Sequence, residues 1–340
     1  PNHQRAPEEV TEENWFFRLS RYCEQIISLI SSDDLQIVPA SRRNEVLGFL
    51  RQPLEDISIS RSNERARNWG VPVLGDDTQR MYVWFDALNI YQSGVGFGWD
   101  DAQYEKWWPA DIHLIGKGII RFHAVYWPAF LLSAKLPLPK SIFVHGYITV
   151  DGQKMSKTLG NVIDPFVLIE KYGVDAVRYY LLREIPSGED GDFSIKKFED
   201  RYNGDLANGI GNLVARVAAL GESVSPVSVH TDEKIRKEIA RCRAVHIKGI
   251  TEFRLNETLA GIWEMIGVAD KYINDEKPWT LKTDDATFRR VIGNAAMIVG
   301  VIAELLVPFL PETAAKIREQ INVGERDITI KKGENLFPRL

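Results

Sequence analysis

Two lysines separated by two residues lie in a polar stretch near the middle of the chain. This tetrad, Lys-Met-Ser-Lys at positions 154–157, is flanked by Gly152 and Gly160, and glycine leaves the backbone free to move. Ammonium groups on such a loop suit a reaction in which negative charge builds on a phosphate group and on departing pyrophosphate. Taken alone, four residues favour a solvated, lysine-rich hairpin.

The segments on either side of the tetrad favour a positioned loop over a free hairpin. An apolar run at 141–150 predicts a strand that leads into the loop. Asp164, as an N-cap, and Pro165, at the first helical position, predict a helix that begins soon after the loop, and Gly173 is expected to end it. The tetrad is therefore predicted to join a strand to a helix.

The residues before the loop alternate between helix-like and strand-like patterns. Apolar spacing predicts helices at residues 12–30, 42–51 and 119–134. Apolar runs predict strands at 56–61, at 81–87 with Trp84 and Asp86 near its end, and at 111–116. A strand followed directly by a helix, at 111–134, is typical of a β-α unit in a parallel sheet.

Almost all of the chain after the loop is predicted to be helical. Asp175 is expected to cap a helix at 176–184, and a turn-rich connector follows at 187–192. A helix is predicted from Ser194 onward, and three longer ones at 231–253, 256–274 and 286–306. The fold class is thus predicted to be α/β followed by an all-α bundle.

Two features of the predicted bundle suit contact with RNA. Asn208, Asn212 and Arg216 recur every four residues and so form one polar stripe along a helix. Trp279 follows a proline in a turn, where an exposed indole is a stacking surface for an unpaired base. The ordinary alternatives are a solvated stripe and a tryptophan buried against the bundle.

Composition limits the class of protein. The chain has 340 residues, of which 44% are hydrophobic and 26% charged, so it can form two or more domains with substantial cores. Its net charge is −5, which disfavours a polybasic mode of nucleic-acid binding. Its two cysteines, Cys23 and Cys242, predict no disulfide framework and no zinc knuckle, and they favour a reducing cytoplasm. The most apolar run, 295–310, is shorter than the ~20 residues of a membrane-spanning helix and predicts a buried core helix.

The sequence of the lysine loop and its approach resembles a known family. Lys-Met-Ser-Lys-Thr-Leu-Gly-Asn at 154–161, preceded by a strand with His-Gly-Tyr at 145–147, resembles the lysine loop of class I aminoacyl-tRNA synthetases, with Thr158 where serine is commonest. Over nearly the whole chain the resemblance is to methionyl-tRNA synthetases. It implies activation of methionine by ATP with Mg²⁺, transfer of methionine to tRNA(Met), and a cytoplasmic monomer that contacts no membrane.

The resemblance also implies roles for individual residues. Lys154 and Lys157 are implied to be catalytic; Lys154, Met155, Ser156 and Lys157 to bind ATP; Trp84, Phe122 and His123 to bind methionine; and Asn212, Arg216 and Trp279 to bind the anticodon. No metal ligands are implied in these residues, and a zinc site is allowed only in an insertion upstream of them.

The domain boundaries expected from the resemblance follow the predicted elements. Residues 1–55 are expected to be the end of a connective insertion, 56–192 the second half of a Rossmann-like catalytic domain with the lysine loop, and 193–340 an anticodon-binding bundle. The family's His-Ile-Gly-His signature has no copy here, since His113-Leu-Ile-Gly116 lacks the second histidine. We therefore expect a C-terminal portion that is inactive alone.

Two other functions remain open at the level of sequence. One is a non-catalytic RNA-binding remnant, which is favoured by the missing signature and by Gly118, where the family has an aspartate near the nucleotide ribose. The other is a class I synthetase for a branched aliphatic amino acid or cysteine. The combination of Asn212, Arg216 and Trp279 argues against the latter.

Overall fold

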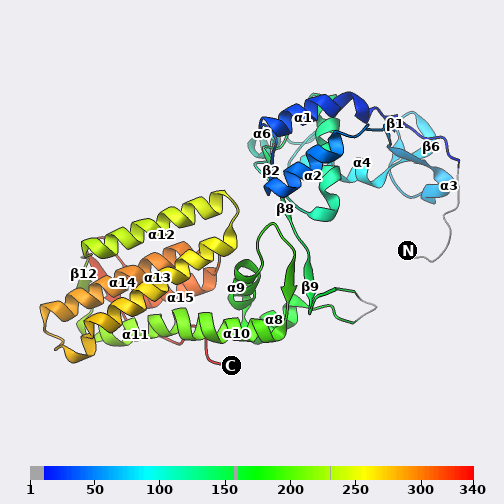
Figure 1. Cartoon of the computed structure of the whole chain (residues 1–340). Helices are drawn as coiled ribbons and strands as arrows, with labels where there is room; N and C mark the ends of the chain where they lie inside the picture. The colour runs from blue at the N-terminus through cyan, green and yellow to red at the C-terminus, as the bar shows by residue number, and fades with distance from the viewer. Residues whose placement is uncertain (1–10, 157–159, 230) are drawn as a thin grey trace. The chain divides into compact units, whose positions relative to one another are not determined.

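The computed structural model describes residues 11–156, 160–229 and 231–340 of the chain (Figure 1). The chain divides into two compact units, the first ending at His145 and the second beginning at Gly146. The predicted combination of an α/β part and a helical part is confirmed. The expected domain boundaries after residues 55 and 192 stay a prediction.

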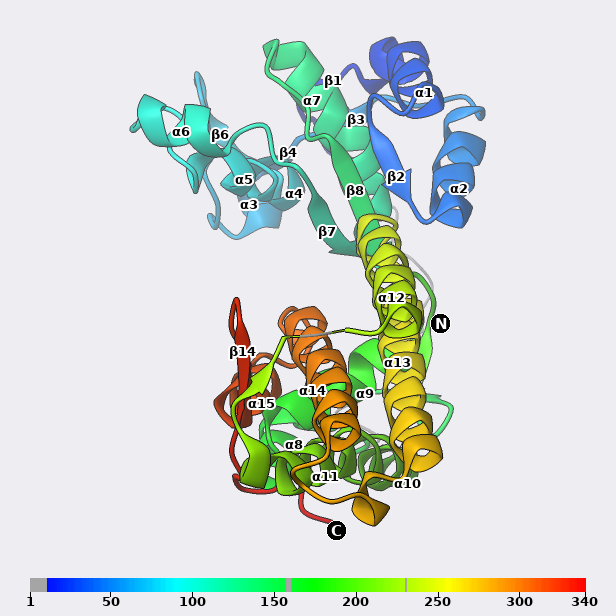
Figure 2. The ribbon, with the colours of Figure 1, turned by 90° about the vertical axis from the view of Figure 1, so that its left-hand side faces the viewer.

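A three-stranded parallel sheet forms the centre of the first unit. Its strands lie in the order β2 (Gln36–Val38), β8 (Ser141–His145) and β7 (His113–Gly116), as Figure 2 shows. The middle strand β8 is buried along residues 141–144, which explains its continuous apolar run. Helices α1 (Cys23–Ser31) and α2 (Ala40–Leu50) share one apolar core with this sheet.

Smaller elements complete the first unit. An antiparallel sheet contains β4 (Ser60–Ser62), β6 (Asp76–Met81) and β5 (Pro72–Val73), and β1 (Phe16–Phe17) pairs with β3 (Ile57–Ser58). The short helices are α3 (Asn63–Ala66), α4 (Val83–Ala87), α5 (Ile90–Ser93) and α6 (Asp101–Trp107). The predicted helix at 42–51 and the predicted strand at 56–61, which is divided into β3 and β4, are confirmed.

The helix predicted from residue 12 is wrong in its first half. The chain there forms β1 and a 3₁₀ turn, η1 (Leu19–Tyr22), and the α-helix begins only at Cys23. The backbone N–H of Trp15 donates to Ser60 Oγ at 2.8 Å, and Phe16 pairs with Ser58. Because these backbone groups bond to distant residues, helical spacing of the side chains does not produce a helix.

The strand predicted at 81–87 is also wrong. Strand β6 ends at Met81 and the chain turns into α4, where the carbonyl of Tyr82 accepts hydrogen bonds from the backbone of Phe85 and Asp86 at 2.9 and 3.1 Å. A short apolar run does not distinguish strand from helix by its periodicity. Trp84 consequently lies on a helix.

Two predicted helices contain π-helical turns. Residues 117–134 form a 3₁₀ turn η2 (Lys117–Ile119), a π-helical segment η3 (Phe122–Tyr126) and α7 (Trp127–Ala134). In the second unit, α10 (Ile195–Arg201) continues into a π-helical segment η4 (Tyr202–Gly211) and then α11 (Asn212–Gly221). Such turns are frequent at functional sites, and both of these carry or adjoin predicted site residues.

The second unit begins with a small sheet that carries the lysine loop. Strand β9 (Ile148–Val150) pairs with β10 (Gln153–Lys154) and, in parallel, with β11 (Gly191–Phe193). Helix α8 (Pro165–Tyr172) is capped by Asp164, whose side chain accepts from the backbone of Phe166 at 2.9 Å, as predicted. Gly173, at φ 88°, ends it.

The predicted capping role of Asp175 is wrong. Helix α9 (Val174–Glu184) begins two residues earlier than predicted, and the buried carboxylate of Asp175 instead accepts from the backbone N–H of Thr313 at 2.6 Å. Thr313 lies in the first turn of α15 (Pro311–Gln320). The tertiary fold thus uses this side chain to cap a helix far along the chain.

Three long helices form the bundle. Helices α12 (Glu233–Thr251), α13 (Leu255–Glu276) and α14 (Ala286–Leu306) pack side by side (Figure 1), and α14 is the core helix predicted from its apolar run. A sheet of β12 (Val227–Ser228), β14 (Asp327–Ile330) and β13 (Ile321–Val323) covers part of α14 and was missed by the sequence prediction. Within the described ranges, no helix is long and apolar enough to span a membrane.

Candidate functional site

The lysine loop is part of a hairpin that is fastened at its base. Asp192 Oδ1, on β11, accepts hydrogen bonds from the backbone N–H of Gly152 and from Thr149 Oγ1, each at 2.7 Å. These bonds hold the pKa of the Asp192 carboxyl below its usual range. Lys154, at the end of β10, is exposed, so the hairpin presents its ammonium group to solvent from a fixed base.

Asn161 closes the other end of the loop. Its Oδ1 accepts from the backbone N–H of Ser156 at 2.8 Å, and its Nδ2 donates to the carbonyl of Lys154 at 3.2 Å. Met155 is half-buried and packs against the apolar core of the second unit. Lys157, the other predicted catalytic lysine, lies outside the described residues. Within the described part of the tetrad, Lys154 is thus exposed while Met155 anchors the loop.

Two of the predicted methionine-binding residues lie together in the first unit. The rings of Trp84 and Phe122 stack with centroids 4.2 Å apart and planes 20° apart. They line a groove of about 240 Å³ whose other walls are mostly apolar and include Tyr82, Phe85, Leu88, Tyr126 and Phe130. This arrangement gives an aromatic surface that suits a slender apolar side chain.

His123, the third predicted methionine-binding residue, does not line this groove and is buried, with 1% of its surface exposed. Its Nδ1 lies 2.9 Å from the carbonyl of Ile119, so it must carry a proton, and its Nε2 then accepts from the hydroxyl of Tyr91 at 2.8 Å. Burial lowers the pKa of His123. His123 is therefore a neutral imidazole that orients Tyr91. Tyr91 was not predicted from the sequence, because no local signal marks it.

His113, which the sequence analysis separated from the family signature, belongs to the same aromatic cluster. Its Nε2 accepts from Trp127 Nε1 at 3.3 Å, and its ring lies 4.3 Å from that of Tyr91. Burial, and secondarily the neighbouring His123, lower the pKa of His113 to about 4. His113 is thus a neutral core residue at neutral pH.

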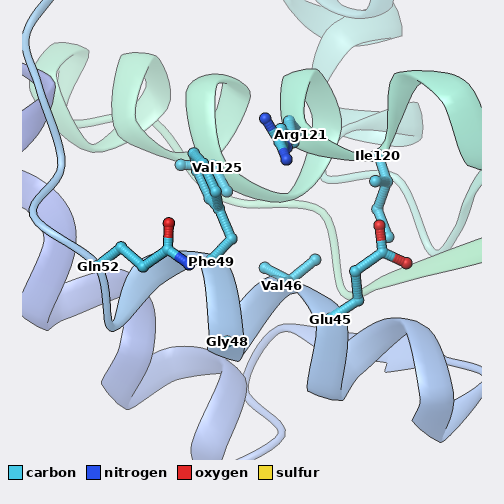
Figure 3. A pocket seen from close by; sticks show the side chains of 8 residues that line it. All are labelled: Glu45, Val46, Gly48, Phe49, Gln52, Ile120, Arg121 and Val125. Atoms are coloured by element: carbon cyan, nitrogen blue, oxygen red, sulfur yellow. The ribbon is translucent and has the colours of Figure 1, made fainter.

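A second groove lies beside the helical segment that carries Phe122, and the neighbouring residues Ile120, Arg121 and Val125 line it. It has a volume of about 330 Å³ and separates α2, which carries Glu45 and Phe49, from the segment that carries Arg121 (Figure 3). The Arg121 guanidinium lies 4.3 Å from the Phe49 ring centroid. Arg121 and Phe122 are adjacent in sequence but line different grooves, and only the groove with Phe122 contains predicted site residues.

Two of the predicted RNA-binding residues also lie together, in the second unit. The guanidinium of Arg216, on α11, lies 5.1 Å from the ring centroid of Trp279, in the turn η6 (Pro278–Thr280). Trp279 is 52% exposed, so the alternative of a tryptophan buried in the bundle is wrong. Asn212 is exposed one turn before Arg216 on the same helix. The three side chains present one amide, one guanidinium and one indole.

The glycines of this helix have a role within the chain. A Cβ on Gly209 would lie 3.4 Å from Trp263 Nε1, and one on Gly211 would lie 3.0 Å from the carbonyl of Leu206. The close approach at these glycines is made by α13, which carries Trp263, and by a π-helical turn. It does not by itself indicate RNA.

Two family comparisons match adjoining parts of the chain. Residues 3–218 match the family described as tRNA synthetases class I (M), and residues 221–336 match the anticodon binding domain of methionyl tRNA ligase. The fold and these matches place the chain in the class I aminoacyl-tRNA synthetases as a family. Within that class, the chain belongs to the methionyl-tRNA synthetase family.

Individual relatives agree with this assignment. The methionine–tRNA ligase of Clostridium acetobutylicum is 42% identical over 366 aligned positions, which cover 100% of this chain and 56% of the relative. That of Thermotoga maritima is 41% identical, covering 96% of this chain and 53% of the relative. The chain therefore spans about half the length of these curated relatives.

Solved structures show the same fold. Methionyl-tRNA synthetase of Mycobacterium tuberculosis bound by methionyl-adenylate matches with a TM-score of 0.88 and 38% identity, over 96% of this chain and 69% of that one. Its apo form matches with a TM-score of 0.87 and 35% identity, over 97% of this chain and 69% of that one.

In the part of this chain that the structure describes, no group of three or more His, Cys, Asp or Glu side chains is arranged to hold a metal ion.

Proposed function

We propose that this chain contributes the lysine loop, part of the amino-acid pocket and the anticodon-binding bundle of a methionine–tRNA ligase. The reaction joins methionine to the α-phosphate of ATP and releases pyrophosphate, and the methionyl group then passes to the terminal ribose of tRNA(Met). The observation that carries the proposal is the exposed Lys154 on a hairpin that Asp192 and Asn161 fasten at both ends. A cytoplasmic monomer is part of the same proposal.

The lysines are proposed to act on MgATP as the substrate. Negative charge shifts toward the pyrophosphate in the transition state, and a fixed ammonium group stabilises that charge more than the ground state. A hairpin base held by Asp192 positions the backbone, while the exposed side chain of Lys154 is left free to follow the phosphates. Lys157 is proposed to share this role.

The aromatic groove is proposed to bind the methionine side chain. A thioether is polarizable and packs well against aromatic rings, and the stacked pair of Trp84 and Phe122 offers such a surface. The neutral His123 accepts the hydrogen bond of the Tyr91 hydroxyl and is proposed to support the pocket from the core.

Replacement of Trp84 by alanine is expected to raise the KM for methionine about 3- to 10-fold with little change in kcat. An aromatic contact of this kind contributes about 0.5–1.5 kcal/mol of binding that ground and transition states share. Pyrophosphate exchange by the full-length gene product, with methionine and with norleucine, measures it. Trp107→Ala, at an exposed tryptophan on α6, is the matched control. Unchanged kinetics with both amino acids would make Trp84 a packing residue only.

The isolated 340-residue chain is expected to bind a methionine anticodon stem-loop without forming methionyl-adenylate. The proposed contacts, Asn212, Arg216 and Trp279, all lie in the second unit, whereas the sequence contains no His-Ile-Gly-His. Trp279→Ala is expected to weaken binding by ~1–3 kcal/mol through lost base stacking. Lys154→Ala should leave it unchanged.

Titration of labelled stem-loops with CAU and substituted anticodons, beside a pyrophosphate-exchange assay, tests both statements. Equal affinity for every anticodon would contradict the reading role. Adenylate made by the isolated chain would contradict its inactivity.

A non-catalytic RNA-binding protein remains the second candidate. It is favoured by Gly118, in the turn η2, where a carboxylate near the nucleotide is expected from the family resemblance. Pyrophosphate exchange by the full-length gene product across a panel of amino acids separates the candidates. Exchange with methionine supports the ligase, and no exchange with any amino acid supports the RNA-binding protein.

A further inference from the structure

Arg216 has two polar side chains of the neighbouring helix α13 beside it. Its Nη2 donates to Asn274 Oδ1 at 2.7 Å, and its Nη1 lies 3.9 Å from Asp270 Oδ1. Asp270 and Asn274 are four residues apart, so they lie on the same face of α13. The guanidinium is thus contacted by α13 and by the Trp279 ring together.

The carboxylate of Asp270 is only partly solvated. Its side chain is 30% exposed, and its buried Oδ1 has no hydrogen-bond partner in the described part of the chain. A charge that has lost hydration interacts with a neighbouring guanidinium more strongly than an exposed surface charge does. This pair therefore restricts where the Arg216 side chain lies.

Arg216 retains donors for another partner. A guanidinium has five N–H groups in a rigid plane, and the structure assigns one of them to Asn274 in a hydrogen bond. The plane also lies near an indole that is half exposed. An unpaired base that stacks on Trp279 would meet an arginine whose position is already determined.

We propose that Asp270 and Asn274 are positioning residues that hold the Arg216 guanidinium beside Trp279 before RNA binds. The inference rests on the tRNA-binding role proposed above and deepens it, since it names what makes that surface selective. A free arginine would lose side-chain freedom on binding, whereas one already held loses less. The gain in affinity applies to an RNA whose base contacts Arg216, so the positioning of Arg216 affects discrimination between anticodons.

The test is a double-mutant cycle in which the measured quantity is the discrimination between anticodons. The quantity is the ratio of the Kd for a stem-loop with a substituted anticodon to the Kd for one with CAU. Asn274→Ala is expected to lower this ratio about 3- to 10-fold, and to have no effect in a chain that already carries Arg216→Ala. Asn274→Asp keeps an acceptor oxygen for Arg216 and is expected to keep the ratio.

Two further variants separate positioning from charge. Asp270→Asn removes a negative charge near RNA, which strengthens binding to every stem-loop alike, yet it should still lower the ratio because the guanidinium is less restrained. Asp275→Asn is the matched control: Asp275 neighbours Asn274 in sequence but lines a different groove with Asp232 and Lys234, so the ratio should stay unchanged.

The outcomes separate this inference from the proposed function. An Asn274→Ala effect of equal size with and without Arg216, or no effect at all while Arg216→Ala and Trp279→Ala lower the ratio, would overturn the positioning role alone. If Arg216→Ala and Trp279→Ala themselves leave stem-loop binding unchanged, the proposed anticodon-binding function fails.

Discussion

Replacement of Lys154 and Lys157 together by alanine is expected to slow adenylate formation by the full-length gene product at least about 10²- to 10³-fold. Loss of a single donor that stabilises transition-state charge commonly costs ~2.7–4 kcal/mol. Methionine affinity should change little, because the proposed methionine groove is formed by residues of the first unit, among them Trp84 and Phe122. The hydrogen bonds of Asn161 should persist, since they join its side chain to the backbone of Lys154 and Ser156, which the substitutions keep.

Single-turnover adenylation, measured by rapid quench with saturating MgATP, gives the rate directly. Lys234→Ala with Lys237→Ala is a matched control, because these are also two exposed lysines, on α12 of the bundle. An unchanged adenylation rate in the Lys154/Lys157 variant would remove the basis for the catalytic assignment.

Acidification is expected to destabilise the first unit through His113. The pKa of His113 is lowered from 6.5 to about 4 by burial, so between these values the unfolded state binds a proton that the folded state does not. The contribution of neutral His113 to the free energy of unfolding is therefore complete above pH 6.5 and is lost as the pH falls toward 4. The loss is about 3 kcal/mol in all and about 2 kcal/mol at pH 5.

His113→Gln should flatten this dependence. Glutamine does not titrate, and its side-chain oxygen can accept the hydrogen bond that Trp127 Nε1 donates. Urea unfolding of the whole chain, followed by tryptophan fluorescence between pH 7 and about pH 5, gives the free energy of unfolding of each protein at each pH. The slope of this free energy against pH is then compared between the two proteins. Equal slopes would show that His113 does not carry the effect.

The proposed site was predictable from sequence where a motif marks it. The lysine tetrad and the stripe of Asn212 and Arg216 are visible in the residues, and so is Trp279 after its proline. Tyr91, Asn274 and Asp270 were missed. Each acts on a predicted site residue through space, over a separation of 32, 58 and 54 positions, respectively, and no periodicity or cap connects them.

Local physics determined several elements without help from the rest of the chain. Asp164 and Gly173 bound α8 because a side-chain cap and a glycine with positive φ depend on backbone groups within a few residues. The bounds of α14 follow from its long apolar period. The residues of the lysine loop also indicated the family, because this motif is contiguous and can be recognised without the tertiary structure.

Only the tertiary structure decided what the remaining polar and aromatic side chains do. Asp175 resembles a local cap but bonds Thr313, because α15 packs against α9 and the first N–H groups of a helix have no acceptor within that helix. Trp84 was predicted on a strand but stacks on Phe122 from a helix, because the periodicity of a short apolar run does not distinguish a strand from a helix. Capping and spacing act within one segment, whereas burial and desolvation depend on which segments meet, and that is a property of the folded chain.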